Sequence, residues 1–318
     1  MRYLSKRTAC SVTPVPFRAC RPMLVFLLIA LLTALIAACS TASSGTRATP
    51  NTVSGARLTA SGVNIAKLST ITVTAHDYSF AMPTTIPAGL TVVKLVNAGA
   101  QPHQASFGRI KPGVTLDQVL AAAKRGASAE LYIYSALDFA GGPNTSSPQS
   151  QQETILNLRP GHYVALCFVP GPDGMPHYQM GMITPFTVTA ASGQAPRGEP
   201  TADVVVRLVN FGFVMLANVR KGDLVKVVNQ GTEAHEMTVV QLSPGKTVQD
   251  ILAWAQKPSA TFPFLFEGGM APIAPGSTGW VRLSLNPGRY VMICNVIDPT
   301  TGKRHVLLGM ISPFTVQA

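Results

Sequence analysis

Apolar and polar residues alternate in two stretches that lie far apart in the chain. The segments "TVVKLVN" at 91–97 and "LVKVVNQ" at 224–230 place apolar side chains at alternate positions, as strands with one buried face do. Further short runs rich in Val, Ile, Leu, Thr and Tyr are bounded by turns such as "RPGHY" and "NPGRY". In two other segments, 116–124 and 248–256, apolar residues recur every three or four positions, which predicts a helix.

The same order of segments occurs twice. "GVTLDQVLAAAKRG" aligns with "GKTVQDILAWAQKP", "LNLRPGHYVALCF" with "LSLNPGRYVMICN", and "GMITPFTVTA" with "GMISPFTVQA", at offsets between 127 and 133 residues. This tandem duplication predicts an all-β chain with two antiparallel β-sandwich domains, each with one short helical insertion. We place domain 1 at 69–190, a linker at 191–201 and domain 2 at 202–318.

The N-terminal region predicts export. The apolar run "MLVFLLIALLTALIAA", 23–38, follows a basic stretch and is short for a membrane-spanning helix, so residues 1–38 are interpreted as a signal peptide. "LIAAC" resembles a bacterial lipobox, which implies lipidation of Cys39; cleavage as an ordinary signal peptide is the alternative. Residues 39–68 are predicted to be a Ser/Thr-rich tether. We therefore expect an exported protein, lipid-anchored on the extracytoplasmic side of a bacterial membrane.

The formal net charge of +11 changes this picture little. Five of the 25 Lys and Arg residues, and none of the 14 acids, lie in residues 1–38. The remaining positive excess is spread thinly, without a run of Lys or Arg, so we expect no nucleic-acid partner.

Cysteine usage is more informative. Cys10, Cys20 and Cys39 precede the repeats, which leaves only Cys167 in the first domain and Cys294 in the second. One cysteine per domain does not favour a disulfide framework. A lone thiol in an oxidising compartment has to be buried or bound to a metal.

Histidine and methionine recur in register with these cysteines. A histidine stands six residues after Asn97 and again six residues after Asn229, and each cysteine is followed by a histidine and then a methionine. The two sets are His103, Cys167, His177 and Met182, and His235, Cys294, His305 and Met310. One thiolate, two imidazoles and a weak axial thioether are the ligands of a blue copper site.

At these residues the chain resembles the cupredoxin, or blue copper, family, and its plastocyanin-like members in particular. "NAGAQPHQ" resembles the segment of the first histidine, and "GHYVALC" with the following His and Met resembles the cysteine strand and ligand loop. The resemblance covers both repeats. It implies a Greek-key sandwich and one copper ion per domain, held by the two sets above, in a protein that passes electrons between redox protein partners. The nine or ten residues between Cys and second His exceed those of small electron carriers and are closer to copper nitrite reductases.

Other interpretations of the ligand sets stay open. A single His can simply hydrogen-bond and a single Met can simply pack. Met180 competes with Met182 as axial ligand, although its counterpart Leu308 cannot bind a metal. The chain could also bind another soft metal, store or deliver copper without electron transfer, or be a metal-free interaction module.

Conserved spacing inside the repeat also suggests supporting roles. Asn97 and Asn229 are predicted to hold the ligand loops together through side-chain hydrogen bonds. Gly181 and Gly309 are predicted to let the backbone approach the metal closely.

The histidine count predicts that the chain is not an enzyme. It has six histidines and no His-x-His pair of the kind that a trinuclear copper cluster needs. After the ligands are assigned, only His76 and His162 remain, too few for a three-histidine catalytic copper unless chains share ligands.

Overall fold

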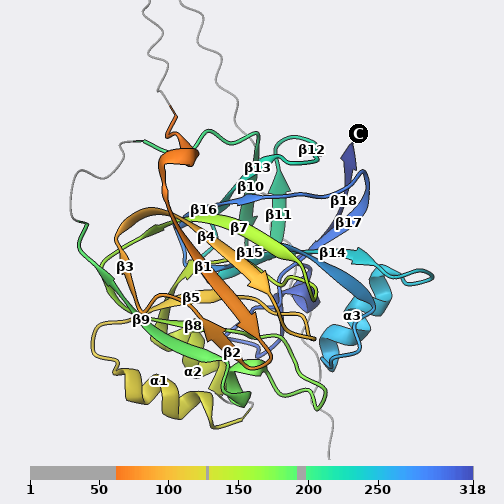
Figure 1. The fold of residues 1–318 in the computed structure, drawn as a ribbon. Helices are drawn as coiled ribbons and strands as arrows, with labels where there is room; N and C mark the ends of the chain where they lie inside the picture. The colour runs from red at the N-terminus through yellow and green to blue at the C-terminus, as the bar shows by residue number, and fades with distance from the viewer. Residues whose placement is uncertain (1–61, 127–128, 192–197, 318) are drawn as a thin grey trace, which may run out of the picture. The chain divides into compact units, whose positions relative to one another are not determined.

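The computed structural model describes residues 62–126, 129–191 and 198–317 (Figure 1). The predicted signal peptide, the predicted lipidation site Cys39 and most of the predicted tether lie outside these residues. Within the described part, no helix combines the length and the apolar character needed to cross a membrane.

Strands dominate both repeats. In the first repeat the elements are η1 (Ile65–Lys67), β1 (Ser69–His76), β2 (Ser79–Ala81), β3 (Thr85–Pro87), β4 (Gly89–Asn97), β5 (Ser106–Ile110), α1 (Leu116–Ala123), α2 (Ala129–Ala136), β6 (Leu137–Gly141), β7 (Gln151–Leu158), β8 (Gly161–Leu166), η2 (His177–Met180) and β9 (Ile183–Thr189). In the second repeat they are β10 (Val204–Val209), β11 (Gly212–Met215), β12 (Val219–Arg220), β13 (Leu224–Asn229), β14 (His235–Leu242), α3 (Val248–Gln256), β15 (Phe264–Ile273), β16 (Thr278–Arg282), β17 (Gly288–Ile293), η3 (His305–Leu308) and β18 (Ile311–Gln317).

The strands form two sheets, and each sheet runs through both repeats. One has the order β11-β10-β13-β16-β7-β4-β1-β2 and the other the order β12-β18-β17-β14-β15-β6-β5-β8-β9-β3. In each repeat, strands of the two sheets enclose a core, which confirms the all-β prediction of two tandem cupredoxin-like sandwiches. The exact domain boundaries stay a prediction.

The pairing is mixed and not purely antiparallel as expected. β1 runs parallel to β4, and β10 runs parallel to β13 at the equivalent place in the second repeat. Strands β3 and β9, and β12 and β18, are also parallel. Alternating burial marks a strand and its buried face, but it says nothing of the direction of the neighbouring strand, so the sequence did not show this.

The two repeats join along a seam of four strands. In one sheet β7 pairs antiparallel with β16, with Ile155 opposite Trp280. In the other, β6 meets β15 at Ala140 and Ile273. Figure 1 shows β7 beside β16 in the middle of the molecule. One cluster of buried apolar side chains contains residues of both repeats, so the repeats share a core.

The helices cover the outer face of the second sheet. α1 and α3 lie where the sequence predicts helices, and each begins at a threonine whose side or main chain bonds with a residue one turn later, Gln118 or Asp250. The buried faces of α1 and α2 pack on one apolar cluster and that of α3 on another.

The prediction of one helical insertion per domain is wrong for the first repeat, which also contains α2. The counterpart of α2 in the second repeat, 256–263, contains Pro258 and Pro263, which oppose a helix. Four α2 residues are buried although its apolar positions have little helical periodicity: Ala129, Glu130, Ile133 and Ala136. Tertiary contacts, and not the local pattern, therefore place this helix.

Candidate metal centres

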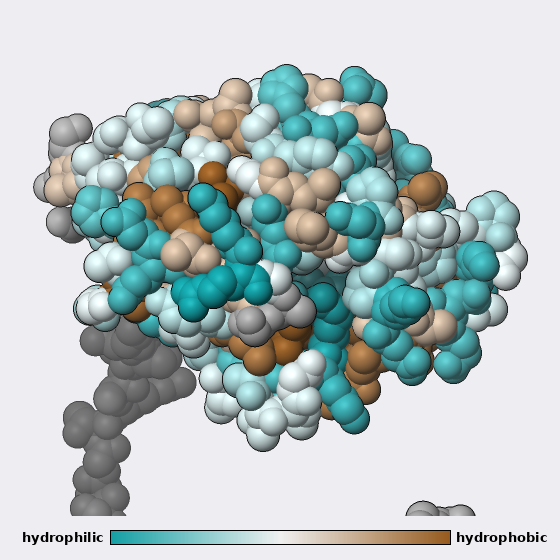
Figure 2. Space-filling view, turned by 90° about the horizontal axis from the view of Figure 1, so that it is seen from below, coloured by the Kyte–Doolittle hydropathy of each residue, from teal (hydrophilic) through white to brown (hydrophobic). Residues whose placement is uncertain are grey.

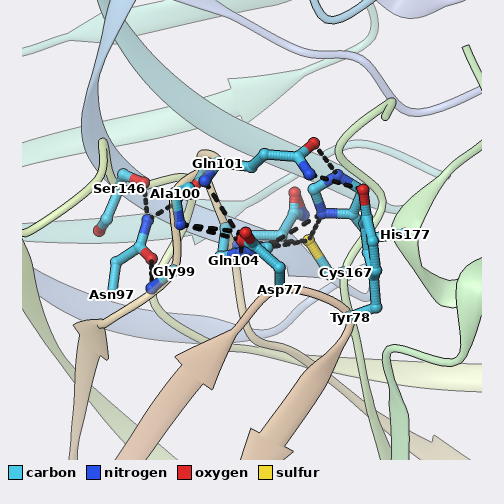
Figure 3. Close-up of polar contacts among 11 residues, drawn as sticks. Asp77, Tyr78, Asn97, Gly99, Ala100, Gln101, Gln104, Ser146, Cys167 and His177 are labelled. Carbon is cyan, nitrogen blue, oxygen red and sulfur yellow. Dashed lines mark hydrogen bonds and ion pairs between the residues drawn. The ribbon is translucent and has the colours of Figure 1, made fainter. Parts of the chain in front are cut away.

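The structure brings the two histidines and the cysteine of each repeat together. In the first repeat, Cys167 Sγ lies 3.5 Å from His177 Nδ1 and 3.9 Å from His103 Nδ1, and the two Nδ1 atoms are 3.1 Å apart (Figure 3). All three side chains are 0 % exposed. The cluster can therefore be reached from solvent only through the groups that surround it.

The second repeat contains the same arrangement. Cys294 Sγ lies 3.4 Å from His305 Nδ1, and the Nδ1 atoms of His235 and His305 are 2.9 Å apart. The donor atoms of each cluster lie within 4.8 Å of one another. Cys167 and Cys294 are both buried free thiols.

Strand ends fix these positions. Cys167 follows β8 directly, and its counterpart Cys294 follows β17. His235 is the first residue of β14, while His103 forms an isolated bridge with Ser146 just before β5. Because their backbones are hydrogen-bonded into the sandwich, the ligands are in place before a metal arrives.

The asparagines support the first histidine of each site as predicted. Asn97 Nδ2 donates to the carbonyls of Gln101 and Ser146 at 2.8 and 2.9 Å. Asn229 Nδ2 makes the equivalent bonds to Glu233 and Ile273 at 2.7 and 2.8 Å. These bonds join the ligand loop to the neighbouring chain segment. The prediction that both asparagines hold the ligand loops together through side-chain hydrogen bonds is therefore confirmed.

The long cysteine-to-histidine loops close on themselves. In the first repeat Pro170 bridges Pro176, and in the second Ile297 bridges Arg304. In both, the ligand histidine is then held by a backbone bond, from His177 N to Val169 O at 2.9 Å or from His305 N to Val296 O at 2.8 Å. The residues between these bridges form the extra length of each loop, while the two ends of the loop stay paired with each other.

The methionines occupy equivalent positions. Met182 is 0 % exposed, its carbonyl accepts from Cys167 N at 3.2 Å, and its amide donates to His177 O at 2.9 Å. Met310 makes the same two bonds with Cys294 and His305. Their place next to both ligands fits an axial thioether, but ligation by the two sulfur atoms, and the complete set of eight ligands, stay predictions.

The structure gives Gly181 and Gly309 a role that the sequence did not predict. Gly181 and Gly309 have φ of 110° and 107°, the left-handed region, and they end the short helices η2 and η3. A Cβ at either would meet nothing closer than 3.7 Å. They are needed for backbone conformation and not for close packing with other protein atoms, while their close approach to the metal stays a prediction. Close packing occurs at Gly99, where a Cβ would lie 2.7 Å from His103 Nε2, and at Gly231, which faces His235 in the same way.

Four outward partners, which sequence reasoning missed, orient the histidine rings. They are Asp77 on His103 at 2.8 Å, Gln101 on His177 at 3.2 Å, Asn210 on His235 at 2.8 Å and Glu233 on His305 at 3.0 Å, each through an oxygen on Nε2. The signal was available, because polar acceptors recur at matched positions of the repeat: Asp77 with Asn210, and Gln101 with Glu233.

These partners decide which ring nitrogen faces each cluster. The Gln101 amide donates to Tyr78 Oη at 2.6 Å, and Asn210 Nδ2 donates to Thr232 Oγ1 at 2.6 Å, so both amide oxygens are left to accept from histidine. Every Nε2 therefore carries its hydrogen, and every Nδ1 presents a lone pair to the cluster. Two lone pairs about 3 Å apart repel each other unless a cation lies between them.

Burial sets the protonation of the metal-free clusters. It raises the pKa of the Cys167 thiol to about 12 and raises that of Cys294 well above its usual range. It lowers the pKa of His177 and His305 to about 4 and that of His235 to about 3. At neutral pH each cluster thus has neutral imidazoles and a protonated thiol, which loses its proton when a metal binds.

The donor set fits copper. A thiolate and two imidazoles suit an ion that is soft as Cu(I) and borderline as Cu(II). The two buried clusters would hold two copper ions, one per repeat, through His103, Cys167 and His177 and through His235, Cys294 and His305.

The fold and these sites define a two-domain protein of the cupredoxin-like class. Solved structures with a similar fold include auracyanin from the photosynthetic bacterium Roseiflexus castenholzii, with 20% identity, coverage of 38% of this chain and 97% of that chain, and a TM-score of 0.27. A multicopper oxidase matches at 15% identity over 79% of this chain and 89% of its own, with a TM-score of 0.24. A copper-containing nitrite reductase from Thermus scotoductus SA-01 matches at 12% identity over 78% and 61%, with a TM-score of 0.21. These likenesses concern the fold alone. No protein-family model and no curated protein matches the chain.

The prediction that the chain is not an enzyme is contradicted by this comparison. The solved structures of similar fold that span both repeats include an oxidase and a nitrite reductase, which are enzymes by name. The histidine count alone does not exclude catalysis, because, as the prediction itself allowed, chains can share the ligands of a metal site.

Proposed function

We propose that this chain is a copper protein that carries single electrons, with one type 1 site in each repeat. The supporting observation is the pair of buried clusters, each with one thiol and two inward-facing Nδ1 atoms. Bound copper supplies one-electron chemistry by alternating between Cu(I) and Cu(II). The strand ends and the hydrogen bonds at Nε2 keep the ligands in one geometry for both oxidation states, which lowers the reorganisation that electron transfer requires.

Electrons would enter and leave through the second histidine of each site. His177 and His305 are buried, but their partners Gln101 and Glu233 are half-buried. The ring of Tyr78 covers His177 edge-on at a centroid distance of 5.1 Å, and Phe211 lies 4.8 Å from His305. A partner that contacts these surface groups would therefore be one hydrogen bond away from a ligand.

The proposed partners are redox proteins that bind briefly. On the face shown in Figure 2, hydrophilic and intermediate residues predominate, and the hydrophobic residues form separate areas. Such a mixed surface suits the small, short-lived contacts of electron-transfer complexes.

The proposed location is the extracytoplasmic side of a bacterial membrane, with a lipid on Cys39 as anchor. The support is the apolar run 23–38, the lipobox-like "LIAAC" and the Ser/Thr-rich stretch that follows. Metabolic labelling with a radioactive fatty acid should mark the full chain and leave Cys39→Ser unlabelled. Labelling of both would show that the lipid lies elsewhere, and labelling of neither would contradict the anchor.

The copper proposal is tested with protein lacking residues 1–44, which keeps the compact unit 58–318. Cu(II) should produce intense visible absorption from thiolate-to-copper charge transfer, with two ions bound per chain. Cys167→Ser should remove the share of one site and Cys294→Ser that of the other, and chemical reduction should bleach both reversibly. Protein that binds no copper or stays colourless would contradict the proposal, and bound copper that cannot be reduced and reoxidised would indicate storage or delivery.

A further inference from the structure

A polar segment of the first repeat, 143–147, crosses the seam between the two clusters. Asn144 in this segment is 0 % exposed. Its side-chain nitrogen Nδ2 donates to Met270 O at 3.0 Å and to Thr238 Oγ1 at 2.9 Å, and both acceptors belong to the second repeat. Buried polar side chains that cross an apolar seam cost free energy unless they are fully bonded. The hydrogen bonds of this segment therefore show how the two repeats are connected across the seam.

On the side of the first cluster, the segment reaches Cys167. Gln104 is the residue after the ligand His103, and its backbone N–H donates to Cys167 Sγ at 3.5 Å. The Thr145 hydroxyl lies between two acceptors, the Gln104 side-chain oxygen at 3.5 Å and Asn144 Oδ1 at 3.1 Å. Thr145 N also donates to Asn144 Oδ1, at 2.6 Å. Backbone, side chain and hydrogen bonds thus connect the Cys167 thiol with Asn144.

On the side of the second cluster, Asn144 reaches Cys294. Asn144 Nδ2 donates to Glu236 Oε2 at 3.3 Å, and Glu236 N donates to Cys294 Sγ at 3.4 Å. Asn295 N, in the peptide that follows the ligand Cys294, donates to Glu236 Oε1 at 2.9 Å. Glu236 follows His235 as Gln104 follows His103, so the link joins equivalent residues of the two sites.

A small cavity borders the middle of this link. Its volume is about 30 Å³, and the residues that line it include Gln104, Thr145, Glu236 and Asn295. A polar cavity of this size holds one or two water molecules. Water at this place would strengthen the step between Gln104 and Thr145.

The bridging groups are not a product of the duplication. The counterpart of Asn144 in the second repeat is Ala271, and that of Thr145 is Pro272, so neither has a side-chain hydrogen bond to offer. The second repeat therefore has no equivalent of this link at the matched positions 271 and 272.

We propose that Gln104, Thr145, Asn144 and Glu236 form a bridge that carries an electron between the two sites within one molecule. The proposal rests on the proposed function. One electron leaves the reduced site, which becomes Cu(II), and enters the oxidised site, which becomes Cu(I); no bond forms or breaks and no proton moves. The first electron comes from an external one-electron donor, and continuous covalent and hydrogen-bonded paths couple the sites better than passage through packed apolar side chains would.

The bridge is tested first in the metal-free full chain, purified in detergent. Hydrogen exchange of the Thr145 and Asn295 amides should be slow, because both donate to groups of the bridge. Asn144→Ala should speed exchange at Thr145. The matched control is Ser147→Ala, which removes a different bond across the seam, to Phe266 O at 2.9 Å, and should leave both amides protected. Equal exchange in wild type and Asn144→Ala would show that the bridge is absent in solution.

Electron exchange is then measured in the copper-loaded full chain. Met310→Leu serves as the background, because loss of the predicted axial ligand should raise the potential of the second site and change its absorption spectrum. Cys167→Ser and Cys294→Ser are the single-site references. After a pulse that delivers less than one electron per molecule, the sites should equilibrate at a rate independent of protein concentration. Thr145→Val removes only the hydroxyl and should cause loss of this phase, leaving a slower one that scales with concentration, whereas Ser147→Ala should keep it.

The outcomes separate the two proposals. Missing charge-transfer absorption would contradict the proposed function, while the amide exchange would still report on the bridge. Two coloured sites that equilibrate equally fast in Thr145→Val and Ser147→Ala would overturn the bridge alone. The proposal would also be overturned if the rate of equilibration depended on protein concentration in the protein whose bridge residues are unchanged.

Discussion

At the scale of single residues, the two sites differ in where their carboxylate lies. In the first site Asp77 bonds the first histidine, and the second histidine has an uncharged amide; in the second site Glu233 bonds the second histidine. A carboxylate at Nε2 makes imidazole a stronger donor and favours the higher oxidation state of the metal. The duplication has thus kept the ligands and exchanged the charges around them.

A reciprocal pair of substitutions tests this asymmetry. Asp77→Asn should raise the reduction potential of the first site, and Asn210→Asp should lower that of the second, because the charge is lost in one and gained in the other. Spectroelectrochemical titration of the single-site variants Cys294→Ser and Cys167→Ser measures each potential. Shifts of the same sign in both would show that the carboxylates do not act through the ligand histidines.

Gly99 provides a second test, because it is packed against His103. Gly99→Ala places a methyl group against His103 and Asp77, so we expect a loss of about 1–3 kcal/mol in the free energy of unfolding and weaker absorption from the first site only. The control is Gly212→Ala, where a Cβ meets only Val209 at 3.6 Å. Urea unfolding of the metal-free protein and spectra of the loaded protein measure both. Equal effects of the two substitutions would contradict the close approach at Gly99.

The buried histidines also predict a pH dependence. Burial lowers the pKa values of His177 and His305 to about 4 and that of His235 to about 3 in the folded state, while histidines of the unfolded chain titrate near 6.5. Between these values the unfolded chain binds more protons, so the metal-free protein should lose stability as pH falls from about 6.5 to 4.5, on the order of a few kcal/mol in total. Urea midpoints across this range measure the slope. His177→Gln should flatten it, and the exposed His162→Gln should not; a slope unchanged by both would assign it to carboxylates.

At the scale of elements, local pattern predicts what local sequence determines. Strands such as β4 and β13, and helices α1 and α3, follow from apolar spacing, and the recurrence of Cys, His and Met reveals the ligand sets. Helix α2 could not be predicted in this way, because its position depends on Arg304, 174 residues further along the chain. The partners Asp77 and Glu233 are separated from their histidines by 26 and 72 residues. The repeat marks these acceptors by their matched positions, but only the fold shows which histidine each of them contacts.

The ion pair that holds α2 can be measured directly. Glu130 Oε1 lies 3.3 Å from Arg304 Nη1, with side-chain exposures of 8 % and 22 %. Glu130→Ala leaves a mostly buried guanidinium without its carboxylate and should cost on the order of 2–4 kcal/mol. Breaking the exposed pair of Lys246 and Asp250 by Lys246→Ala should leave the free energy of unfolding nearly unchanged. Similar losses in the two variants would mean that solvent screens the α2 pair as well.

At the scale of the whole molecule, the sequence indicates two domains but does not reveal that their sheets are continuous. The period of a strand shows which face is buried, and strands β6, β7, β15 and β16 look like any others. Their pairing across the seam and the shared core depend on contacts between segments more than a hundred residues apart. The two repeats therefore share sheets and a core, which a division of the sequence into two separate domains does not suggest.

Shared sheets should make the repeats unfold together. In Cys294→Ser, copper can bind the first site only, yet it should raise the melting temperature of the second repeat equally, because binding stabilises whatever unfolds with the site. Calorimetry, with hydrogen exchange in β17 as a local probe, measures this. Two separate transitions, with only the first shifted by copper, would contradict it.

The seam also governs what becomes of an incomplete molecule. Cleavage in the linker between β9 and β10, followed by separation of the halves, would leave β6 and β7 on one fragment and β15 and β16 on the other with rows of unpaired amides and carbonyls. Such open edges recruit further strands, which makes them sites of aggregation. Each half thus covers the exposed strand edges of the other. A protease that separated the halves would release two aggregation-prone fragments instead of two independently folded domains.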